Sequence, residues 1–275
     1  MLYESHLHTP LCRHAIGWPG EYAAVAERKG FKGIIVTCHA PMPDGYSAHI
    51  RMAVEEFDRY VAMVQQAAKE WQGRVEILLG LESEYVPGFE GWIEELHGRA
   101  RFQHVLGSVH QHAGEYLAAH FRNDWPEFQR TYFRHLAEAA ETGLYDTISH
   151  PDLVKNQNAA EWNRLRVWDD VLRALDRIAA TGVAMELNTS GRNKAVREMN
   201  PGPEMLAAMR ARHIPVVLGA DAHEPRRVGD LYAEALENLR AAGYDEVSYF
   251  IDRQRRTIPI PDALASLRAP AAATR

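Results

Sequence analysis

The sequence predicts an α/β fold in which seven parallel strands alternate with helices and close into a barrel. Short runs rich in apolar and β-branched residues recur at 2–8, 33–39, 75–82, 104–110, 145–150, 183–190 and 216–223. Segments with the periodicity of amphipathic helices lie between them, at 21–30, 52–71, 127–143, 167–182, 204–213 and 230–243. Regular alternation of this kind indicates parallel strands joined by helical crossovers.

The elements can be justified in order along the chain. The first run is LYESHLH, and the next two are GIIVTCH and VEILLGLE. HVLGSVH, YDTISH, VAMELNTS and VVLGADAH follow in the same style. Several predicted helices stop at a glycine, where a helix C-terminus favours a left-handed residue: Gly30, Gly143, Gly182 and Gly243.

A closed barrel fits these elements better than an open doubly wound sheet. The open sheet would suggest a glycine-rich phosphate loop after the first strand, and neither G-x-G-x-x-G nor G-x-x-x-x-G-K-S/T follows residue 8. The sequence contains no internal repeat and no long linker. We therefore expect one domain over residues 1–265, followed by a flexible C-terminal tail at 266–275.

Composition narrows the class of protein. The chain has 275 residues, 46% of them hydrophobic and 25% charged, and no apolar run long enough to span a membrane. The N-terminus lacks the features of a signal peptide, so we expect a cytoplasmic protein whose two cysteines, Cys12 and Cys38, are free thiols. A formal net charge of -6 without a basic stripe argues against a nucleic-acid partner.

Imidazoles and carboxylates gather where the predicted strands end. Barrel enzymes place their chemistry at the C-terminal ends of strands and in the loops that follow, so these positions predict function. Of the seven predicted strands, the sixth ends in Asn188. The ends of the other six, with the loop after the first, supply nine candidate metal ligands: His6, His8, His14, His39, Glu82, His110, His150, Asp221 and His223.

Any one of these histidines could be structural, because buried histidines often only hydrogen-bond to their neighbours. A whole set at one end of the strands favours a metal centre. Nine ligands exceed the needs of one ion, so we expect two or three divalent transition-metal ions, Zn, Fe or Mn, with Glu82 bridging two of them through its two oxygens. His112 is left undecided because it follows His110 by two residues.

The motifs HLHTPLCRHA, HAPMP, GLESEY, GSVH, SHPDL, ELNTSG and GADAH occur in this order along nearly the whole chain. Together they resemble the PHP (polymerase and histidinol phosphatase) superfamily of metal-dependent phosphoesterases, and within it the histidinol-phosphate phosphatase branch. The resemblance implies a distorted (β/α)7 barrel. It also implies that His6, His8, Glu82 and Asp221 hold a first ion, Glu82, His110 and His150 a second, and His14, His39 and His223 a third.

By the same resemblance, the activity would be hydrolysis of L-histidinol phosphate to L-histidinol and phosphate in histidine biosynthesis, by attack of a metal-bridging hydroxide. The catalytic residues would be His6, His8, Glu82, His110, Asp221 and His223. The substrate would be a small phosphate monoester, with no membrane partner. Lys155, Arg192 and Lys194 are candidates to bind its phosphate, although relatives carry Gly-Leu-Arg where this chain has Gly-Arg-Asn-Lys.

Three alternatives stay open. A phosphoesterase of the same superfamily could act on a nucleotide, phosphotyrosine or DNA ends. A barrel amidohydrolase also begins with HxH but would want Lys or Glu after strand four and His after strands five and six, whereas strand four here ends in His110 and strand six in Asn188. A non-catalytic metal-binding relative is disfavoured by the complete ligand set. Cys38 stands where relatives have Asp, and we interpret it as a small buried packing residue.

Overall fold

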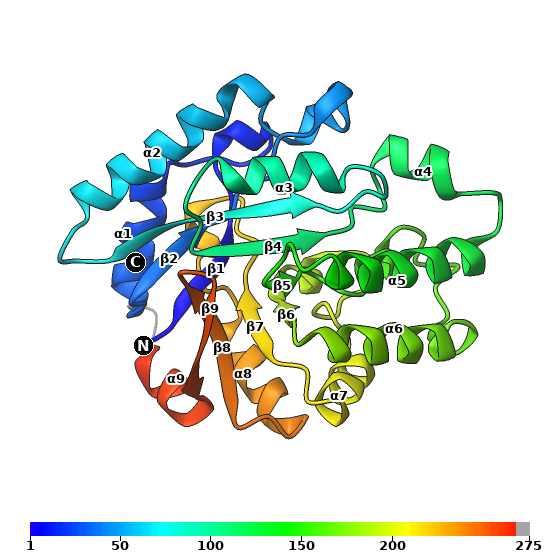
Figure 1. The fold of residues 1–275 in the computed structure, drawn as a ribbon. Coiled ribbons are helices and arrows are strands. Elements are labelled where there is room, and N and C mark those ends of the chain that lie inside the picture. The colour runs from blue at the N-terminus through cyan, green and yellow to red at the C-terminus, as the bar shows by residue number, and fades with distance from the viewer. Residues whose placement is uncertain (268–275) are drawn as a thin grey trace.

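The computed structural model describes residues 1–267 and arranges nine strands in sequential order in one sheet (Figure 1). Neighbours are parallel from β1 to β8, and only the last pair is antiparallel. The strands are β1 (Tyr3–Leu7), β2 (Gly33–Val36), β3 (Glu76–Glu84), β4 (His104–Ser108), β5 (Thr147–Ile148), β6 (Ala184–Asn188), β7 (Val216–Gly219), β8 (Glu246–Ile251) and β9 (Gln254–Pro259).

The first and seventh strands meet, so the parallel strands form a distorted barrel, as predicted. Leu7 and Ala222 form an isolated parallel bridge. His8 donates its backbone N–H to the carbonyl of Ala222 at 3.0 Å, and Ala222 donates to the carbonyl of His6 at 3.0 Å. The contact lies at the C-terminal ends of β1 and β7, which brings the first and last groups of predicted ligands together.

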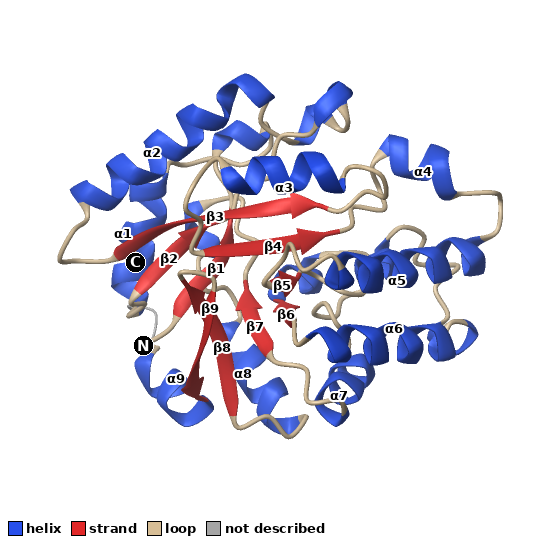
Figure 2. Cartoon of the chain, in the orientation of Figure 1, coloured by secondary structure: helices blue, strands red, loops and turns tan. Residues whose placement is uncertain are grey.

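Helices surround these strands (Figure 2). They are α1 (Pro19–Lys29), α2 (Phe57–Glu70), α3 (Glu90–Gly98), α4 (Gly114–His120), α5 (Trp125–Glu141), α6 (Trp168–Thr181), α7 (Pro203–Ala211), α8 (Tyr232–Ala241) and α9 (Ile260–Ser266). In α6 the buried residues Val171, Ala174, Leu175 and Ile178 recur at the spacing of one helix face, and the helix packs mainly against α5. The helix ends at Gly182, whose φ of 77° is the left-handed conformation that the sequence predicts there.

The hairpin β8–β9 is absent from the sequence prediction, which stops at seven strands. Its two-residue turn, Asp252 and Arg253, has φ angles of 52° and 61°. Phe250 on β8 packs with Ala184 and Val217 and stacks on His104, with ring centroids 4.9 Å apart. Since His104 begins β4, the hairpin fills the end of the barrel opposite the predicted ligands.

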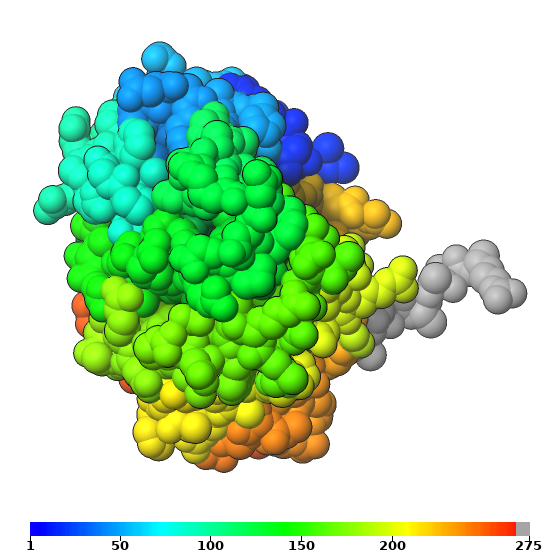
Figure 3. Space-filling view, turned by 90° about the vertical axis from the view of Figure 1, so that its right-hand side faces the viewer, coloured from blue at the N-terminus to red at the C-terminus, as the bar shows by residue number. Residues whose placement is uncertain are grey.

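Figure 3 views the molecule from the side toward which β3 and β4 point, where blue and green residues from the loop after β2 and from α4 and α5 lie against one another. The loop and α4 are tied together because Ser47 donates its backbone N–H to Glu115 at 3.0 Å. The sequence predicts a flexible tail over residues 266–275. Ser266 is the last residue of α9, and residues 268–275 lie outside the described part of the chain. Within residues 1–267, no helix is both long and apolar enough to cross a bilayer.

Candidate metal centre

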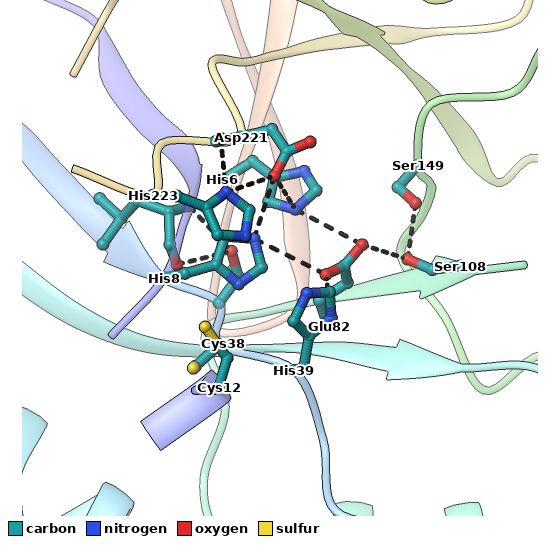
Figure 4. A network of polar contacts seen from close by, with 12 residues as sticks. His6, His8, Cys12, Cys38, His39, Glu82, Ser108, Ser149, Asp221 and His223 are labelled. Atoms are coloured by element: carbon teal, nitrogen blue, oxygen red, sulfur yellow. Dashed lines mark hydrogen bonds and ion pairs between the residues drawn. The ribbon is translucent and has the colours of Figure 1, made fainter. Parts of the chain in front are cut away.

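The carboxylate of Glu82, on β3, lies at the centre of a cluster of imidazoles (Figure 4). Its Oε1 is 3.0 Å from Nε2 of His150, 3.4 Å from Nε2 of His110 and 3.5 Å from Nε2 of His6. Its Oε2 is 2.7 Å from Nδ1 of His39 and 3.7 Å from Nε2 of His8. One buried carboxylate therefore touches ligand candidates from β1, β2, β4 and β5, the position expected of a bridging group.

Asp221, which follows β7, lies near His6 and His8 and joins His223 to the cluster. Its Oδ1 is 3.1 Å from Nε2 of His8 and 3.7 Å from Nε2 of His6. The ring of His223 stacks on that of His8 with centroids 4.0 Å apart, and the ring of His14 is 4.4 Å from that of His223. The structure thus brings all nine predicted ligands into one connected group.

A cavity of about 300 Å³ opens onto this group. It is lined by His14, His39, Ile50, His110, His112, His150, Leu153, Lys194, Asp221 and His223. His112, which sequence reasoning left undecided, is on this wall. The histidines to which the sequence assigns no role include His97, His104 and His135, and these hydrogen-bond instead to Ser83, Thr147 and Tyr116.

Glu186, on β6, holds two of the ligands and was missed by sequence reasoning. Its Oε1 accepts a hydrogen bond from Nδ1 of His6 at 2.7 Å, and its Oε2 accepts the backbone N–H of His150 at 2.8 Å. A Cβ at Gly219 would lie 1.9 Å from that Oε1, so glycine leaves the space in which Glu186 reaches His6. Ligand histidines commonly donate their second ring N–H to a carboxylate in this way.

Glu84 orients His110 in the same way, and sequence reasoning missed it as well. Its Oε2 is 2.5 Å from Nδ1 of His110, and its Oε1 accepts the backbone N–H of His110 at 2.8 Å. Arg51, fully buried, pairs with Glu84 at 3.0 Å. A detectable signal existed, because Glu82 and Glu84 are two residues apart in a strand and therefore face the same side.

Two of the predicted ligands have an unusual backbone conformation. His150 has a φ of 24° and Asp221 a φ of 50°, a region that residues other than glycine rarely adopt. Such strain is typically found at functional sites and persists when surrounding contacts fix it. For His150 that contact is the hydrogen bond to Glu186; for Asp221 it is the hydroxyl of Ser190, which donates to Oδ2 at 3.0 Å.

The electrostatics of the cluster favour ionised carboxylates. Burial by itself would raise the pKa of Glu82, but the positive potential of His39, His6 and His110 holds that pKa well below its usual range. Burial also opposes ionisation of Glu84, yet His110 and Arg51 lower its pKa to about 2. Carboxylates that stay charged at neutral pH are suited to binding cations.

The donor set fits divalent transition metals. Nδ1 of His6 donates to the carboxylate of Glu186, and a cation at Nε2 would replace the proton that gives this ring its positive charge. His6 Nε2 and His223 Nε2 are buried and make no hydrogen bond within the described residues. Buried polar atoms are nearly always satisfied, and a cation among these atoms would satisfy them. Imidazole nitrogens with carboxylate oxygens suit Zn, Fe or Mn.

The three basic residues expected at the phosphate lie in different places. Lys155 is fully buried, with Nζ 2.9 Å from Asp152, 3.3 Å from Glu198 and 2.9 Å from the carbonyl of Met199. Arg192 pairs with Glu234 on α8 at 2.9 Å and lines a separate cavity. Lys194 alone of the three lines the histidine cavity. Lys155 and Arg192 pair with carboxylates away from the lining of the histidine cavity, and their binding of phosphate stays a prediction.

Comparisons with known proteins find relatives along most of the chain. The family model described as PHP domain matches residues 4–190. A probable histidinol-phosphatase of Deinococcus radiodurans is 38% identical over 264 residues, covering 94% of this chain and 99% of the relative. A histidinol-phosphatase of Bacillus subtilis is 28% identical and covers 85% of this chain and 98% of its own.

Among solved structures, histidinol phosphate phosphatase of Lactococcus lactis, complexed with zinc, L-histidinol and phosphate, matches with a TM-score of 0.76. The match covers 93% of this chain and 98% of the other at 19% identity, and at this identity it shows a likeness of fold alone. The family model spans well over half of the chain, and the Deinococcus radiodurans relative is similar along nearly all of it. This chain belongs to the PHP domain family.

Proposed function

We propose that the protein is a metal-dependent histidinol-phosphate phosphatase that hydrolyses L-histidinol phosphate to L-histidinol and phosphate in histidine biosynthesis. The observation that carries the proposal is the position of Glu82, whose two oxygens lie within 3.7 Å of five imidazoles at the end of the barrel. The identity of 38% to a probable histidinol-phosphatase over 94% of the chain supports this substrate.

The resemblance to the PHP superfamily assigns the residues that would hold metal. His6, His8, Glu82 and Asp221 would hold one ion, Glu82, His110 and His150 a second, and His14, His39 and His223 a third. Bound divalent ions would supply Lewis-acid stabilisation of the phosphoryl group and activation of water. This matters because phosphate monoesters hydrolyse extremely slowly without a catalyst.

The chain's own residues bind and orient around that centre. Glu186 and Glu84 fix the ring orientations of His6 and His110 by accepting from their Nδ1 atoms. Lys194, on the cavity wall, would contact the anionic phosphoryl oxygens, while Ile50 and Leu153 supply apolar surface for the rest of the substrate. Holding the ester in one pose against preset charges is the main source of catalysis in phosphoryl transfer.

A substrate comparison tests the proposal. Phosphate release is measured with the metal-loaded protein on L-histidinol phosphate, mononucleotides and phosphotyrosine, and with His110→Ala as the control for contaminating phosphatases. We expect kcat/KM for L-histidinol phosphate to exceed the others by about 100-fold or more, since a pocket built for one substrate's polar groups rejects analogues strongly. A preference for nucleotides or phosphotyrosine would contradict the substrate assignment.

A further inference from the structure

Cys12 lies against the proposed third metal position. It ends a short 3₁₀ turn, Pro10–Cys12, in the loop between β1 and α1, and its side chain is fully buried. Its sulfur and one ring nitrogen each of His14 and His223 all lie within 4.8 Å of one another. The sulfur also lies within 4.8 Å of a ring nitrogen of His8 and of the sulfur of Cys38. Figure 4 shows the two sulfur atoms close together below His8.

The two histidines beside Cys12 are in the tautomer that a metal ligand needs. Nδ1 of His14 lies 2.7 Å from the carbonyl oxygen of Cys12, and Nδ1 of His223 lies 3.1 Å from the carbonyl oxygen of Asp221. A carbonyl only accepts, so both Nδ1 atoms donate and both Nε2 atoms keep their lone pairs. Nε2 of His223 is buried and without a hydrogen-bond partner in the described chain.

The second cysteine is engaged differently. The sulfur of Cys38 accepts hydrogen bonds from the backbone N–H of Thr9 at 3.4 Å and from its hydroxyl at 3.2 Å. Cys38 is grouped only with Cys12 and His8, whereas Cys12 is also grouped with His14 and His223. The two thiols are equally buried neighbours, but only Cys12 is placed beside both rings.

We propose that Cys12 is a ligand of the third metal position together with His14 and His223, which makes that position selective for a thiophilic ion such as zinc. The proposal rests on the metal centre described above and adds a sulfur donor to it. Ligand atoms around a tetrahedral zinc, at ~2.0–2.3 Å from the ion, are about 3.5 Å apart, so the grouping needs only small movements to close on an ion. The ion takes the place of the thiol proton, which passes to solvent.

The two proposed metal positions that share Glu82 differ in ligand chemistry from the position at Cys12. Their candidate ligands are imidazole nitrogens and carboxylate oxygens, which also accept manganese and iron, whereas thiolate selects softer ions. The centre would therefore hold chemically distinct ions. A protein supplied with zinc and manganese together would place zinc at the Cys12 position.

The test uses the protein loaded with cobalt, because cobalt bound to thiolate gives a near-ultraviolet charge-transfer band that nitrogen and oxygen ligands do not give. We expect the band in wild type and in Cys38→Ala, and its loss in Cys12→Ser, while the visible cobalt bands of the other positions remain. Cobalt bound without a charge-transfer band in wild type, or a band lost in Cys38→Ala and kept in Cys12→Ser, would overturn the assignment. Failure of wild type to bind cobalt would overturn the metal centre itself as well as the proposal.

A second measurement needs no variant and so does not depend on whether Cys12→Ser folds. Zinc-edge X-ray absorption of the zinc-loaded wild type should show a sulfur neighbour at ~2.3 Å. A first shell of nitrogen and oxygen alone would refute the role of Cys12. Turnover of L-histidinol phosphate by the same sample reports separately on the proposed function.

Discussion

Glu186 contacts one proposed ligand through its ring and another through its backbone, since it accepts from Nδ1 of His6 and from the N–H of His150. These two histidines belong to different proposed ions. A carboxylate that fixes both should influence the affinity for both, although it touches neither ion. This arrangement separates the residues that bind metal from those that orient the binding groups.

Glu186→Gln should weaken metal binding about 10- to 100-fold, because the amide keeps the shape but is a poorer acceptor for the His6 N–H. Metal retained after dialysis against graded chelator concentrations measures the effect. Glu234→Gln is the matched control, since its carboxylate pairs with Arg192 outside the histidine cavity. Equal affinities in the two variants would show that Glu186 does not position the ligands.

Lys194→Ala should raise KM for L-histidinol phosphate about 10-fold or more, since a hydrogen bond to a charged group contributes about 1.5–3 kcal/mol. Steady-state kinetics of the metal-loaded enzyme measure the change. Arg192→Ala removes a charge two residues away that is engaged by Glu234, and we expect its KM to stay near that of wild type. A larger effect from Arg192 than from Lys194 would reverse the assignment of the phosphate contact.

At the scale of residues, the sequence predicts where the candidate ligands lie better than it predicts which side chains orient them. The candidate ligands could be recognised because each lies at the end of a predicted strand or in the loop after it, and the structure brings them together; their binding of metal stays a prediction. Glu186 and Glu84 lie within strands, and their roles depend on which strands become neighbours. The space for Glu186 further depends on Gly219, more than 30 residues away in the sequence, and no local pattern contains that relation.

At the scale of elements, the alternation of strand and helix is visible in the sequence for seven strands, and β8 and β9 interrupt it. Their sequences, EVSYFI and QRRTIP, are separated by only two residues, which is a hairpin signal. The turn residues Asp252 and Arg253 are not the Asn-Gly or Asp-Gly pair that marks such turns most clearly. The sequence therefore predicts neither the hairpin nor its packing at the end of the barrel opposite the candidate ligands.

Phe250→Ala should lower the free energy of unfolding by about 3–5 kcal/mol, because it removes a buried ring that stacks on His104 and packs against Ala184 and Val217. Urea unfolding followed by circular dichroism measures the loss. Metal content should be unchanged, since His104 and His110 lie at opposite ends of β4. Arg255→Ala, on the exposed face of β9, should change stability by no more than ~0.5 kcal/mol. A loss for Phe250→Ala no greater than the control would refute the packing role of β8.

At the scale of the whole molecule, the barrel collects ligands from strands that are distant in sequence. The sequence predicts the order of strands and their parallel direction, because alternation and crossovers are local patterns. It predicts that the first and seventh strands meet, but not that Leu7 and Ala222 are the residues that form the bridge, because that contact forms only when all the intervening units are in place. The contact between β1 and the residues after β7 places Asp221 beside His6 and His8.

Buried neutral histidines should make the fold sensitive to acid. Burial lowers the pKa of His104 to about 3, compared with about 6.5 for an exposed histidine. Between these values the unfolded chain binds a proton that the folded chain does not, so stability falls as the pH falls from 6.5 toward 3. The contribution is fully present above pH ~6.5 and declines by up to ~1.4 kcal/mol per pH unit below it.

His104→Asn should remove this contribution. The difference in unfolding free energy between wild type and variant, measured by urea titration at several pH values, should shift in favour of the variant as the pH is lowered from about 6.5 to 4. A difference that does not change with pH would mean that His104 is protonated in the folded protein.

The most direct measurement of the central claim is the metal content of the purified protein, taken together with turnover of L-histidinol phosphate before and after chelation. The account predicts at least two transition-metal ions per chain, loss of turnover when they are removed, recovery when zinc, iron or manganese is restored, and no recovery in Glu82→Gln. Undiminished turnover by the metal-free protein would contradict it.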